Sequence, residues 1–266
     1  MQLFVYGSLL RGMSLSSHME GARFLGPAFV QADLFFLGFY PGIIPGTQTV
    51  LGELYDVPPA ILPNIDKVED YYENDPENSI YLRKPIEAYL FSNGNKIEAF
   101  AYYYNRESEG KPRIPCGDYR RFMHMQKADW AWLIGYGTYL SSERIISKAG
   151  PVSESMLVQI HGFERVFNVK TGKNGFAHAN LNFTGKDQFL KAIAWKLTRQ
   201  QLEKLDIEEN VPHLYHRLSI PFRNRCGELE IAQTYIANIN QIGQNLYPEP
   251  QYLEILKKGM REHGIY

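Results

Sequence analysis

The amino-acid sequence predicts an α+β protein built from two similar domains in tandem. Its 266 residues allow one large domain or two small ones. Aromatic residues make up 14% of the chain, and its 22 glycines and 15 prolines favour short strands and many turns over long helices. Three short segments of the first half recur, in the same order, in the second half. This recurrence is the observation that favours two domains.

The first recurring segment is an apolar strand that ends in a glycine turn. The run Leu3–Tyr6 has the composition of a buried strand, and Gly7 then breaks it. Much later, Trp132–Tyr136 is followed by Gly137 in the same way. The two openings, Tyr6-Gly7-Ser8-Leu9-Leu10 and Tyr136-Gly137-Thr138-Tyr139-Leu140, lie 130 residues apart.

The second recurring segment is a strand followed by a helix. The strand Leu54–Val57 leads into apolar residues with helical spacing, and the strand Ala192–Leu197 leads into a helix that Thr198 is suited to cap. Both predicted helices end in an acidic string, and the two strings lie 140 residues apart. They are Ile65-Asp66-Lys67-Val68-Glu69 and Leu205-Asp206-Ile207-Glu208-Glu209.

The third recurring segment precedes an alternating strand in each half. It is Tyr81-Leu82-Arg83 in the first half and Tyr215-His216-Arg217 in the second, 134 residues apart. A period of this size is too long for a solenoid repeat and fits a duplicated domain. We therefore expect domains at 1–125 and 126–266, joined near residues 122–129.

Composition excludes several function classes. A formal net charge of −1 gives no reason to expect a nucleic acid or a membrane as partner. No apolar run is long enough to cross a bilayer, and the N-terminus lacks the features of a signal peptide, so we expect a cytoplasmic protein. Cys116 and Cys226 are too few for a disulfide framework, and the seven histidines show no metal-ligand spacing.

The segments of the first half resemble the gamma-glutamylcyclotransferase-like superfamily, and in particular its AIG2-like, gamma-glutamylamine-cyclotransferase branch. The resemblance covers nearly all of residues 1–122, in the order of the family. It rests on Leu3-Phe4-Val5-Tyr6-Gly7-Ser8-Leu9, Phe39-Tyr40-Pro41-Gly42, Val50-Leu51-Gly52-Glu53-Leu54-Tyr55-Asp56-Val57, Ile65-Asp66-Lys67-Val68-Glu69, Tyr81-Leu82-Arg83 and Cys116-Gly117-Asp118-Tyr119.

The second half is more similar to the larger gamma-glutamylcyclotransferase branch of that superfamily. The similarity includes the opening Tyr136–Leu140 and the closing segment Tyr252–Gly264. Three positions depart from the usual pattern: Thr138 stands for Ser, Tyr139 replaces a small or polar residue, and Asn210 stands where the family often has Gly. We expect these departures to affect substrate fit in the second half more than in the first.

The resemblance implies a fold and an activity. The fold is a small mixed β-barrel with flanking helices in each domain, without cofactor or metal. The activity is that of a cyclotransferase, of transferase or lyase type, acting on a small gamma-glutamyl compound. The α-amine of the substrate attacks its own γ-carbonyl group, which gives 5-oxoproline and releases an amine or amino acid. One glutamate is the acid/base.

Glu69 and Glu209 hold the position of that glutamate in the two halves. The attacking amine is largely protonated near neutral pH, and a carboxylate within reach can take its proton and later give one to the leaving nitrogen. The neighbouring Glu208 leaves the register of the second site open. The alternative interpretation of each acid is a solvated charge at a helix end.

The glycine turns are candidate binding sites for the substrate's α-carboxylate. The first candidate is Tyr6–Leu9 and the second is Tyr136–Leu140. Glycine lets backbone N–H groups converge on an anion, and Ser8 or Thr138 adds a hydroxyl donor. The same donors, or others nearby, would stabilise the oxyanion formed by attack. A plain tight turn is the alternative.

Tyr81 and Tyr215 are expected to line the two pockets. Arg83 and Arg217 are candidates for bidentate anchoring of a carboxylate, and an arginine paired with a protein acid is the equally open alternative. At the level of the whole chain, a non-catalytic ligand-binding or regulatory protein on degenerate cyclotransferase domains stays open. An acyl-transfer hydrolase that uses Cys116 or a serine is a weaker alternative.

Overall fold

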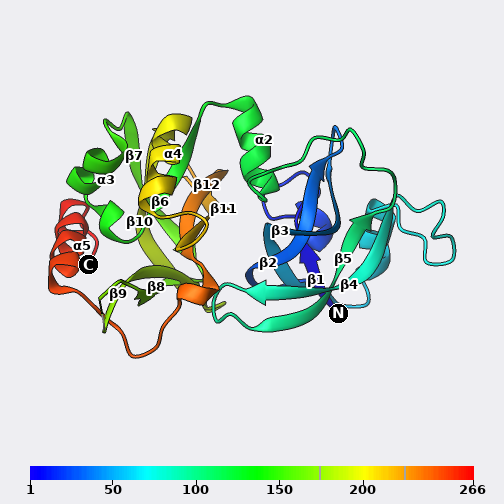
Figure 1. Cartoon of the computed structure of the whole chain (residues 1–266), viewed down its shortest axis with the longest axis horizontal. Coiled ribbons are helices and arrows are strands. Elements are labelled where there is room, and N and C mark those ends of the chain that lie inside the picture. Colours follow the sequence, from blue (N-terminus) through cyan, green and yellow to red (C-terminus); the bar gives the residue numbers. More distant parts are fainter. Residues whose placement is uncertain (174, 225) are drawn as a thin grey trace. The chain divides into compact units, whose positions relative to one another are not determined.

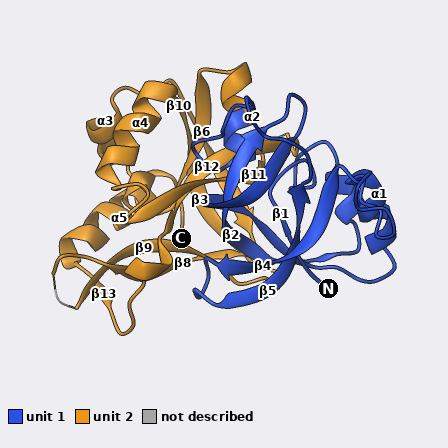
Figure 2. Cartoon of the chain, turned by 45° about the vertical axis from the view of Figure 1, so that its right-hand side comes forward, with its two compact units in different colours: residues 1–122 blue, residues 123–266 orange. Residues whose placement is uncertain are grey.

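The first half of the chain folds into a closed β-barrel. The computed structural model describes residues 1–173, 175–224 and 226–266. The chain divides into two compact units, Met1–Phe122 and Met123–Tyr266 (Figure 2). The elements of the first unit, in chain order, are β1 (Gln2–Val5), β2 (Arg23–Phe36), β3 (Pro41–Asp56), α1 (Leu62–Val68), β4 (Tyr81–Leu90), β5 (Lys96–Tyr104) and the start of α2 (Tyr119–Lys127) (Figure 1). The expected domain limit at residue 125 lies within α2.

The barrel strands follow the order β1-β3-β2-β4-β5. Strand β1 pairs antiparallel with β3 and parallel with β5, so the short opening strand lies between two longer ones. Strands β2 and β3 form a long hairpin with irregularities in register, including one between Gln31 and Asp33, that help it curve around the barrel. The apolar sides of β1, β3 and β5 share one core with Ile65 of α1. This packing places the end of α1 against the end of β1.

The second unit repeats this pairing scheme with its long strands divided. Its elements are β6 (Trp130–Gly135), α3 (Ser142–Ala149), β7 (Glu154–His161), β8 (Phe163–Lys170), β9 (Phe176–Phe183), β10 (Phe189–Thr198), α4 (Arg199–Glu208), β11 (Tyr215–Arg223), β12 (Leu229–Ala237), β13 (Tyr247–Pro248) and α5 (Pro250–Glu262). Strand β6 pairs antiparallel with β10 and parallel with β12, as β1 does with β3 and β5.

The division of the strands distinguishes the second unit from the first. Strands β7 and β8 take the place of β2, and β9 and β10 take the place of β3, with a break at Gly162 in its left-handed conformation (φ 77°). The result is a five-stranded sheet, β11-β12-β6-β10-β7, and a three-stranded sheet, β13-β9-β8. Both sheets contribute to one apolar core, to which Val169 of β8 and Ile193 of β10 belong. The second unit is therefore a mixed α+β fold whose two sheets share one core.

Local sequence explains the two helices that matter for the sites. Helix α1 follows two prolines and has a proline in its first turn, where the missing N–H group costs nothing. Helix α4 begins with the expected cap: the Thr198 hydroxyl accepts the Gln201 N–H, and the Gln201 side chain accepts the Thr198 N–H. Leu202 and Leu205 are buried as predicted. None of the helices among the described residues is long and apolar enough to cross a membrane.

Candidate active sites

The turn after β1 and the end of α1 enclose a cavity of about 230 Å³ in the first unit. The predicted site residues Tyr6, Gly7, Ser8, Leu9, Glu69 and Tyr81 all line it. Two segments of the chain that are 60 residues apart are thus brought to one place. Arg83, also predicted to bind substrate, is not among the lining residues.

The turn itself requires glycine at position 7. A Cβ atom there would lie 2.7 Å from Cγ of Pro41, which is closer than such atoms can approach. The turn is closed by the Leu10 N–H, which donates to Gly7 O at 3.1 Å, and by the Leu15 N–H, which donates to Ser8 O at 3.0 Å. These bonds do not use the N–H groups of Gly7, Ser8 and Leu9. Those groups are therefore the ones from which an anion-binding turn would be built.

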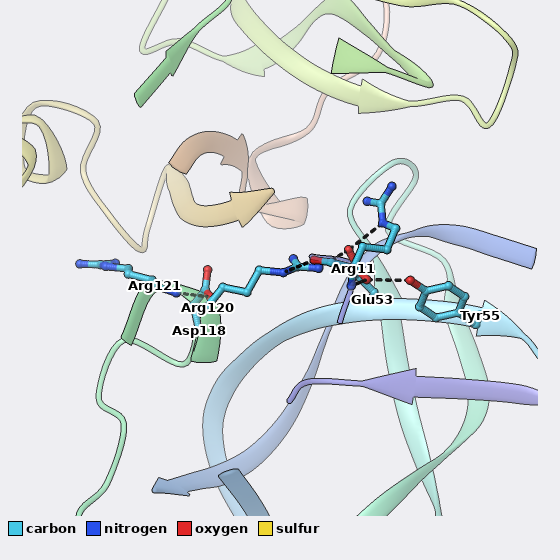
Figure 3. Close-up of polar contacts among 6 residues, drawn as sticks. All are labelled: Arg11, Glu53, Tyr55, Asp118, Arg120 and Arg121. Carbon is cyan, nitrogen blue, oxygen red and sulfur yellow. Dashed lines mark hydrogen bonds and ion pairs between the residues drawn. The ribbon is translucent and has the colours of Figure 1, made fainter. Parts of the chain in front are cut away.

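A buried carboxylate holds the far end of this turn in place (Figure 3). Glu53 of β3 accepts hydrogen bonds from the Arg11 backbone N–H at 3.1 Å and from Arg11 Nε at 3.0 Å. It also accepts one from Arg120 Nη2 at 2.6 Å and one from the Tyr55 hydroxyl at 2.8 Å. Burial opposes its charge, but Arg120 and Arg11 outweigh burial and lower the pKa of Glu53 to about 2. The turn is thus fixed to the barrel by an ionised side chain.

Glu69 occupies the C-cap position of α1, with φ −87° and ψ 6°. Asp70 follows in the left-handed conformation with φ 47°, which Asp tolerates better than most residues. Burial, with a smaller contribution from the charge of Asp70, raises the pKa of the Glu69 carboxyl to about 8. Among the described residues no side chain or backbone group hydrogen-bonds this carboxyl group. It is therefore available to a substrate in the cavity.

The tyrosines of the first cavity are held by backbone carbonyl groups. The Tyr6 hydroxyl donates to Tyr102 O at 2.6 Å, and the Tyr81 hydroxyl donates to Pro41 O at 2.6 Å. Behind them, Asp66 of α1 accepts hydrogen bonds from the Tyr102 hydroxyl at 2.6 Å and from Arg83 Nη1 at 2.5 and 2.6 Å. Arg83 of β4 therefore pairs with a protein acid, Asp66 of α1. This pairing is the alternative that the sequence left open beside the anchoring of a substrate carboxylate.

The second unit brings the corresponding residues together around a cavity of about 40 Å³. The predicted residues Tyr136, Gly137, Thr138, Tyr139, Glu209 and Tyr215 line it, whereas Leu140 lies in the apolar core. Glu209 has the backbone conformation of Glu69, with φ −86° and ψ 4°, and Asn210 repeats the left-handed conformation of Asp70 with φ 49°. Glu208 is exposed and forms an ion pair with Lys148 at 2.5 Å, so Glu209 is the acid at the cavity.

The supporting hydrogen bonds recur as well. The Tyr136 hydroxyl donates to Tyr235 O at 2.8 Å, and the Tyr215 hydroxyl donates to Ala179 O at 2.8 Å. Asp206 of α4 accepts hydrogen bonds from Arg217 Nη2 at 2.7 Å and from the Tyr235 hydroxyl at 3.1 Å. The scaffold around each glutamate is thus the same in both units.

The side chains that line the second cavity differ from those that line the first. Tyr252 of α5 lines this cavity, and its hydroxyl accepts the Ala179 N–H at 3.1 Å. A Cβ atom on Gly137 would lie 2.9 Å from that hydroxyl oxygen. Burial raises the pKa of Glu209, while the Tyr139 hydroxyl within hydrogen-bonding range and the Arg144 charge act against that rise. The second glutamate therefore has hydrogen-bonding and charged partners, whereas the described residues offer no hydrogen-bond partner to the first.

Sequence reasoning missed three kinds of residue. Tyr252 was not predicted to line a site, because nothing in a C-terminal helix indicates that it reaches a turn more than 100 residues earlier. Asp70 follows directly after Glu69 and lines the first cavity, and its acidic neighbour was the available signal. Phe39 and Tyr40 also line that cavity. Cys116 lines neither of these cavities, which removes the geometric basis for it as a nucleophile.

Metal-ligating side chains do not gather at either site. Within the described ranges, no group of three or more His, Cys, Asp or Glu residues could hold a metal ion. Neither Cys116 nor Cys226 forms a disulfide bond.

Family models match both halves of the chain. The model "Gamma-glutamyl cyclotransferase, AIG2-like" matches residues 3–121, and the model "AIG2-like family" matches residues 191–266. In the solved structure of YkqA from Bacillus subtilis, the same fold extends over both units: the TM-score is 0.78 at 15% identity, covering 98% of this chain and 92% of that one.

Curated relatives align with the first half. The gamma-glutamylcyclotransferase family protein YtfP of Escherichia coli K12 is 33% identical over 120 residues, which is 45% of this chain and 96% of YtfP. A gamma-L-glutamyl-butirosin B gamma-glutamyl cyclotransferase of Niallia circulans is 31% identical over 124 residues, which is 46% of this chain and 78% of that protein. The chain therefore belongs to the gamma-glutamylcyclotransferase family and carries two domains of that kind in tandem.

Proposed function

We propose that the first unit cleaves gamma-glutamyl amides by intramolecular aminolysis. The α-amino nitrogen of the substrate forms a bond with its own γ-carbonyl carbon, and the bond from that carbon to the leaving nitrogen breaks. The products are 5-oxoproline and a free amine or amino acid, and no water is consumed. The observation that carries the proposal is Glu69, whose unpartnered carboxyl group lines the same cavity as the Gly7–Leu9 turn.

Glu69 supplies the proton transfers of this reaction. Its pKa of about 8 is close to that of an α-amino group, about 7.7–8.0, so the proton moves from the ammonium to Glu69 at little cost. The neutral amine then attacks, and the backbone N–H groups of the turn face the oxygen on which negative charge develops. Protonated Glu69 finally gives its proton to the leaving nitrogen, which restores the carboxylate.

The turn and its support set the orientation of the substrate. The α-carboxylate of the gamma-glutamyl group is assigned to the Gly7–Leu9 turn, which Glu53 and Arg120 hold rigidly. With that end fixed, the α-amine lies beside Glu69. A fixed orientation of this kind converts cyclisation into a reaction between prealigned atoms.

A test of the reaction type is incubation of the protein with a gamma-glutamyl amide in water enriched in oxygen-18. Cyclisation yields 5-oxoproline and amine in equal amounts, and the 5-oxoproline carries no label. Hydrolysis would instead yield glutamate labelled in its γ-carboxyl group, and that result would overturn the proposal. The Glu69→Gln variant serves as the matched control for non-enzymatic cyclisation.

For the second unit we propose a non-catalytic role. A cavity of about 40 Å³ has room for a water molecule or two and lies far below the several hundred Å³ of ordinary small-molecule sites. The Glu209→Gln variant tests this assignment: it should leave the turnover of every gamma-glutamyl compound cleaved by the wild type unchanged.

A further inference from the structure

The position of Glu69 depends on a short helix. Helix α1 has seven residues, fewer than the roughly 12–15 that an isolated helix needs to be stable in water. Its contacts with the barrel therefore fix where it lies. Ile65 packs into the apolar core of the first unit, but apolar packing is not directional. The direction in which the last turn of the helix faces depends on a polar contact, and Asp66 provides it.

Asp66 connects that last turn to two strands of the barrel. Its carboxylate accepts hydrogen bonds from Arg83 Nη1 of β4 at 2.5 and 2.6 Å, and from the Tyr102 hydroxyl of β5 at 2.6 Å. Its backbone carbonyl accepts the Tyr71 N–H at 2.9 Å. Glu69 lies between Asp66 and Tyr71, so the chain is held on both sides of the glutamate. Charge-assisted hydrogen bonds of this kind are roughly twice as strong as neutral ones.

Tyr102 extends this connection to the turn after β1. Its backbone carbonyl accepts the Tyr6 hydroxyl at 2.6 Å, and the residue is buried. One residue of β5 thus contacts the helix that carries Glu69 through its hydroxyl group, and the turn through its carbonyl group. This chain of contacts sets the separation between the carboxyl group of Glu69 and the Gly7–Leu9 turn.

The second unit has the same arrangement around Glu209. The carboxylate of Asp206 accepts hydrogen bonds from Arg217 and from the Tyr235 hydroxyl, and the carbonyl group of Tyr235 again contacts the turn. The backbone carbonyl of Asp206 accepts the Val211 N–H at 2.9 Å. The two cavities differ in size and lining, yet the backbone angles of the two glutamates agree. This agreement supports the aspartate contacts, and not the cavity, as the cause of the glutamate's position.

We propose that Asp66 is the positioning residue of Glu69, with Arg83 as its partner. This inference rests on the proposed function. Neither Asp66 nor Arg83 lines the first cavity, so both act through Glu69. The ionised Asp66 holds the last turn of α1 against β4 and β5, and the carboxyl group of Glu69 then faces the cavity at a fixed place. Proton transfer depends on that place, because a displacement of about 1 Å can cost about 10²-fold in rate.

The pH dependence of the reaction reports this position. Burial is the main cause that raises the pKa of Glu69 to about 8, and the charge of Asp70 adds to it, whereas that of Asp66 does not. Tyr6, after β1, and Tyr81 of β4 also face Glu69, and burial raises the pKa of both, so they stay neutral. A change at Asp66 therefore alters the titration of Glu69 by moving its carboxyl group toward water, which lowers its pKa.

The test compares Asp66→Asn with the wild type on gamma-glutamyl methylamide and gamma-glutamyl alanine. Asparagine keeps the size of aspartate and one acceptor oxygen but loses the charge that holds Arg83. We expect kcat to fall about 10–100-fold with little change in KM, because the turn that we propose to bind the substrate is unchanged. The rising limb of kcat/KM should move by at least about one unit to lower pH, as Glu69 becomes exposed to water.

Arg83→Gln shows whether the pair acts as one unit, and it carries the same readouts should Asp66→Asn fail to fold. It removes the partner of Asp66 from outside the cavity and should lower kcat and shift the rising limb in the same direction. The double variant should lose no more than about twofold beyond the larger single loss, because both substitutions break the same contact. Full multiplication of the two losses would overturn the inference, since the two residues would then act separately.

The matched control is Asp33→Asn in the same unit. The side chain of Asp33 is 21% exposed, as is that of Asp66, and it also pairs with an arginine, Arg113. Asp33 belongs to β2 and does not line the first cavity. Asp33→Asn should therefore leave kcat and the rising limb unchanged. Circular dichroism at the assay temperature shows that each variant is folded.

The outcomes separate the inference from the function. An unchanged kcat in Asp66→Asn, a lower kcat with the rising limb in its wild-type place, or an equal shift in Asp33→Asn would overturn the inference and leave the proposed function intact. If the wild type yields no 5-oxoproline from either amide, the proposed function fails, and carbon-13 NMR then measures the pKa of Glu69 directly, with its signal assigned by Glu69→Gln. A pKa that falls in Asp66→Asn would uphold the inference, and an unchanged or higher pKa would overturn it.

Discussion

The two glutamates, Glu69 and Glu209, have backbone angles that agree within about two degrees, yet they face different surroundings. The first carboxyl group meets a cavity of about 230 Å³ with no hydrogen-bond partner among the described residues, whereas the second meets about 40 Å³ and interacts with Tyr139 and Arg144. A repeated scaffold therefore does not guarantee a repeated site. The side chains that enter from elsewhere decide how much room remains for a substrate.

The anchoring of the two turns differs as well. Glu53 pairs with Val5 across β1 and β3, and Ile193 pairs with Gly135 across β6 and β10, so the two side chains occupy corresponding positions. The first unit fixes its turn with a buried ion pair, and the second fixes its turn with apolar packing and with Trp195, whose Nε1 donates to Tyr139 O at 2.7 Å. Buried ion pairs specify geometry more than they add stability, which suits the anion-binding role that we propose for the first turn.

The largest expected difference between the units is catalytic. Glu69→Gln should lower 5-oxoproline formation about 10²–10⁴-fold, because glutamine keeps the size and hydrogen bonding of glutamate but cannot accept and return a proton. Glu209→Gln should change the rate less than about twofold, since its cavity is too small for substrate. The measurement is 5-oxoproline release from one gamma-glutamyl amide by both variants. Equal losses would show that the cavities do not distinguish the two sites.

The second prediction concerns the buried charge of the first unit. Glu53→Gln should lower the free energy of unfolding of that unit at pH 7 by about 3–5 kcal/mol, because Arg120 would keep its buried charge without its partner's. The folded-state pKa of Glu53 is depressed from 4.5 to about 2, so its contribution is present above pH 4.5 and is lost as the pH falls through 2. The difference between wild type and variant should shrink over that range.

The three tryptophans, all in the second unit, make this measurement possible. Trp130, Trp132 and Trp195 report its unfolding by fluorescence, and circular dichroism follows both units. Glu53→Gln should shift the dichroism transition more than the fluorescence transition. The matched variant Ile193→Val should do the reverse, with a cost of about 0.5–1.5 kcal/mol. A fluorescence shift of equal size in Glu53→Gln would contradict independent anchoring of the two turns.

A third prediction follows from the raised pKa of Glu69. In the proposed mechanism, the reactive pair of free enzyme and free substrate needs an ionised Glu69 and a protonated α-amine. The kcat/KM should therefore rise about tenfold per pH unit up to about 8, where Glu69 has lost its proton, and fall above the pKa of the amine. Asp70 contributes to the high pKa, so Asp70→Asn should move the rising limb to lower pH. A rising limb that stays in place would mean that another group controls it.

The repeated features of the sites were predictable because each is carried by local residues. A glycine turn after a strand and an acidic string at a helix end are visible in the sequence, and their recurrence identified Glu69 and Glu209 together. The role of Arg83 was not predictable, since a substrate carboxylate and the carboxylate of Asp66 present the same chemistry to an arginine. The fold places Arg83 next to Asp66 of α1, so the arginine pairs with this protein carboxylate.

The size of each cavity could not be predicted from the sequence, for a different reason. It depends on long-range contacts, such as that of Tyr252 with the Gly137 turn, which no periodicity or spacing encodes. The division of the second barrel into two sheets also had no local signal, because Gly162 alone does not distinguish a bulge from a break. Local patterns therefore predicted the scaffold, and tertiary packing determined which site has room for a substrate.

The smallest expected effect tests that packing directly, at the two turn glycines. In Gly7→Ala, the new Cβ atom would lie 2.7 Å from Cγ of Pro41, a ring fixed at the start of β3, so overpacking should cost about 1–3 kcal/mol and displace the turn. In Gly137→Ala, the nearest atom is the Tyr252 hydroxyl oxygen at 2.9 Å, the tip of a side chain that can rotate away, and the cost should stay below about 1 kcal/mol. Gly172→Ala, with no atom within 4 Å of its Cβ position, is the control and should be neutral or slightly stabilising.

Urea unfolding followed by circular dichroism and tryptophan fluorescence gives all three values. If Gly137→Ala proves the more costly of the two turn variants, Tyr252 is held rigidly at the second turn, and the second cavity is closed by a fixed wall instead of a side chain that can move.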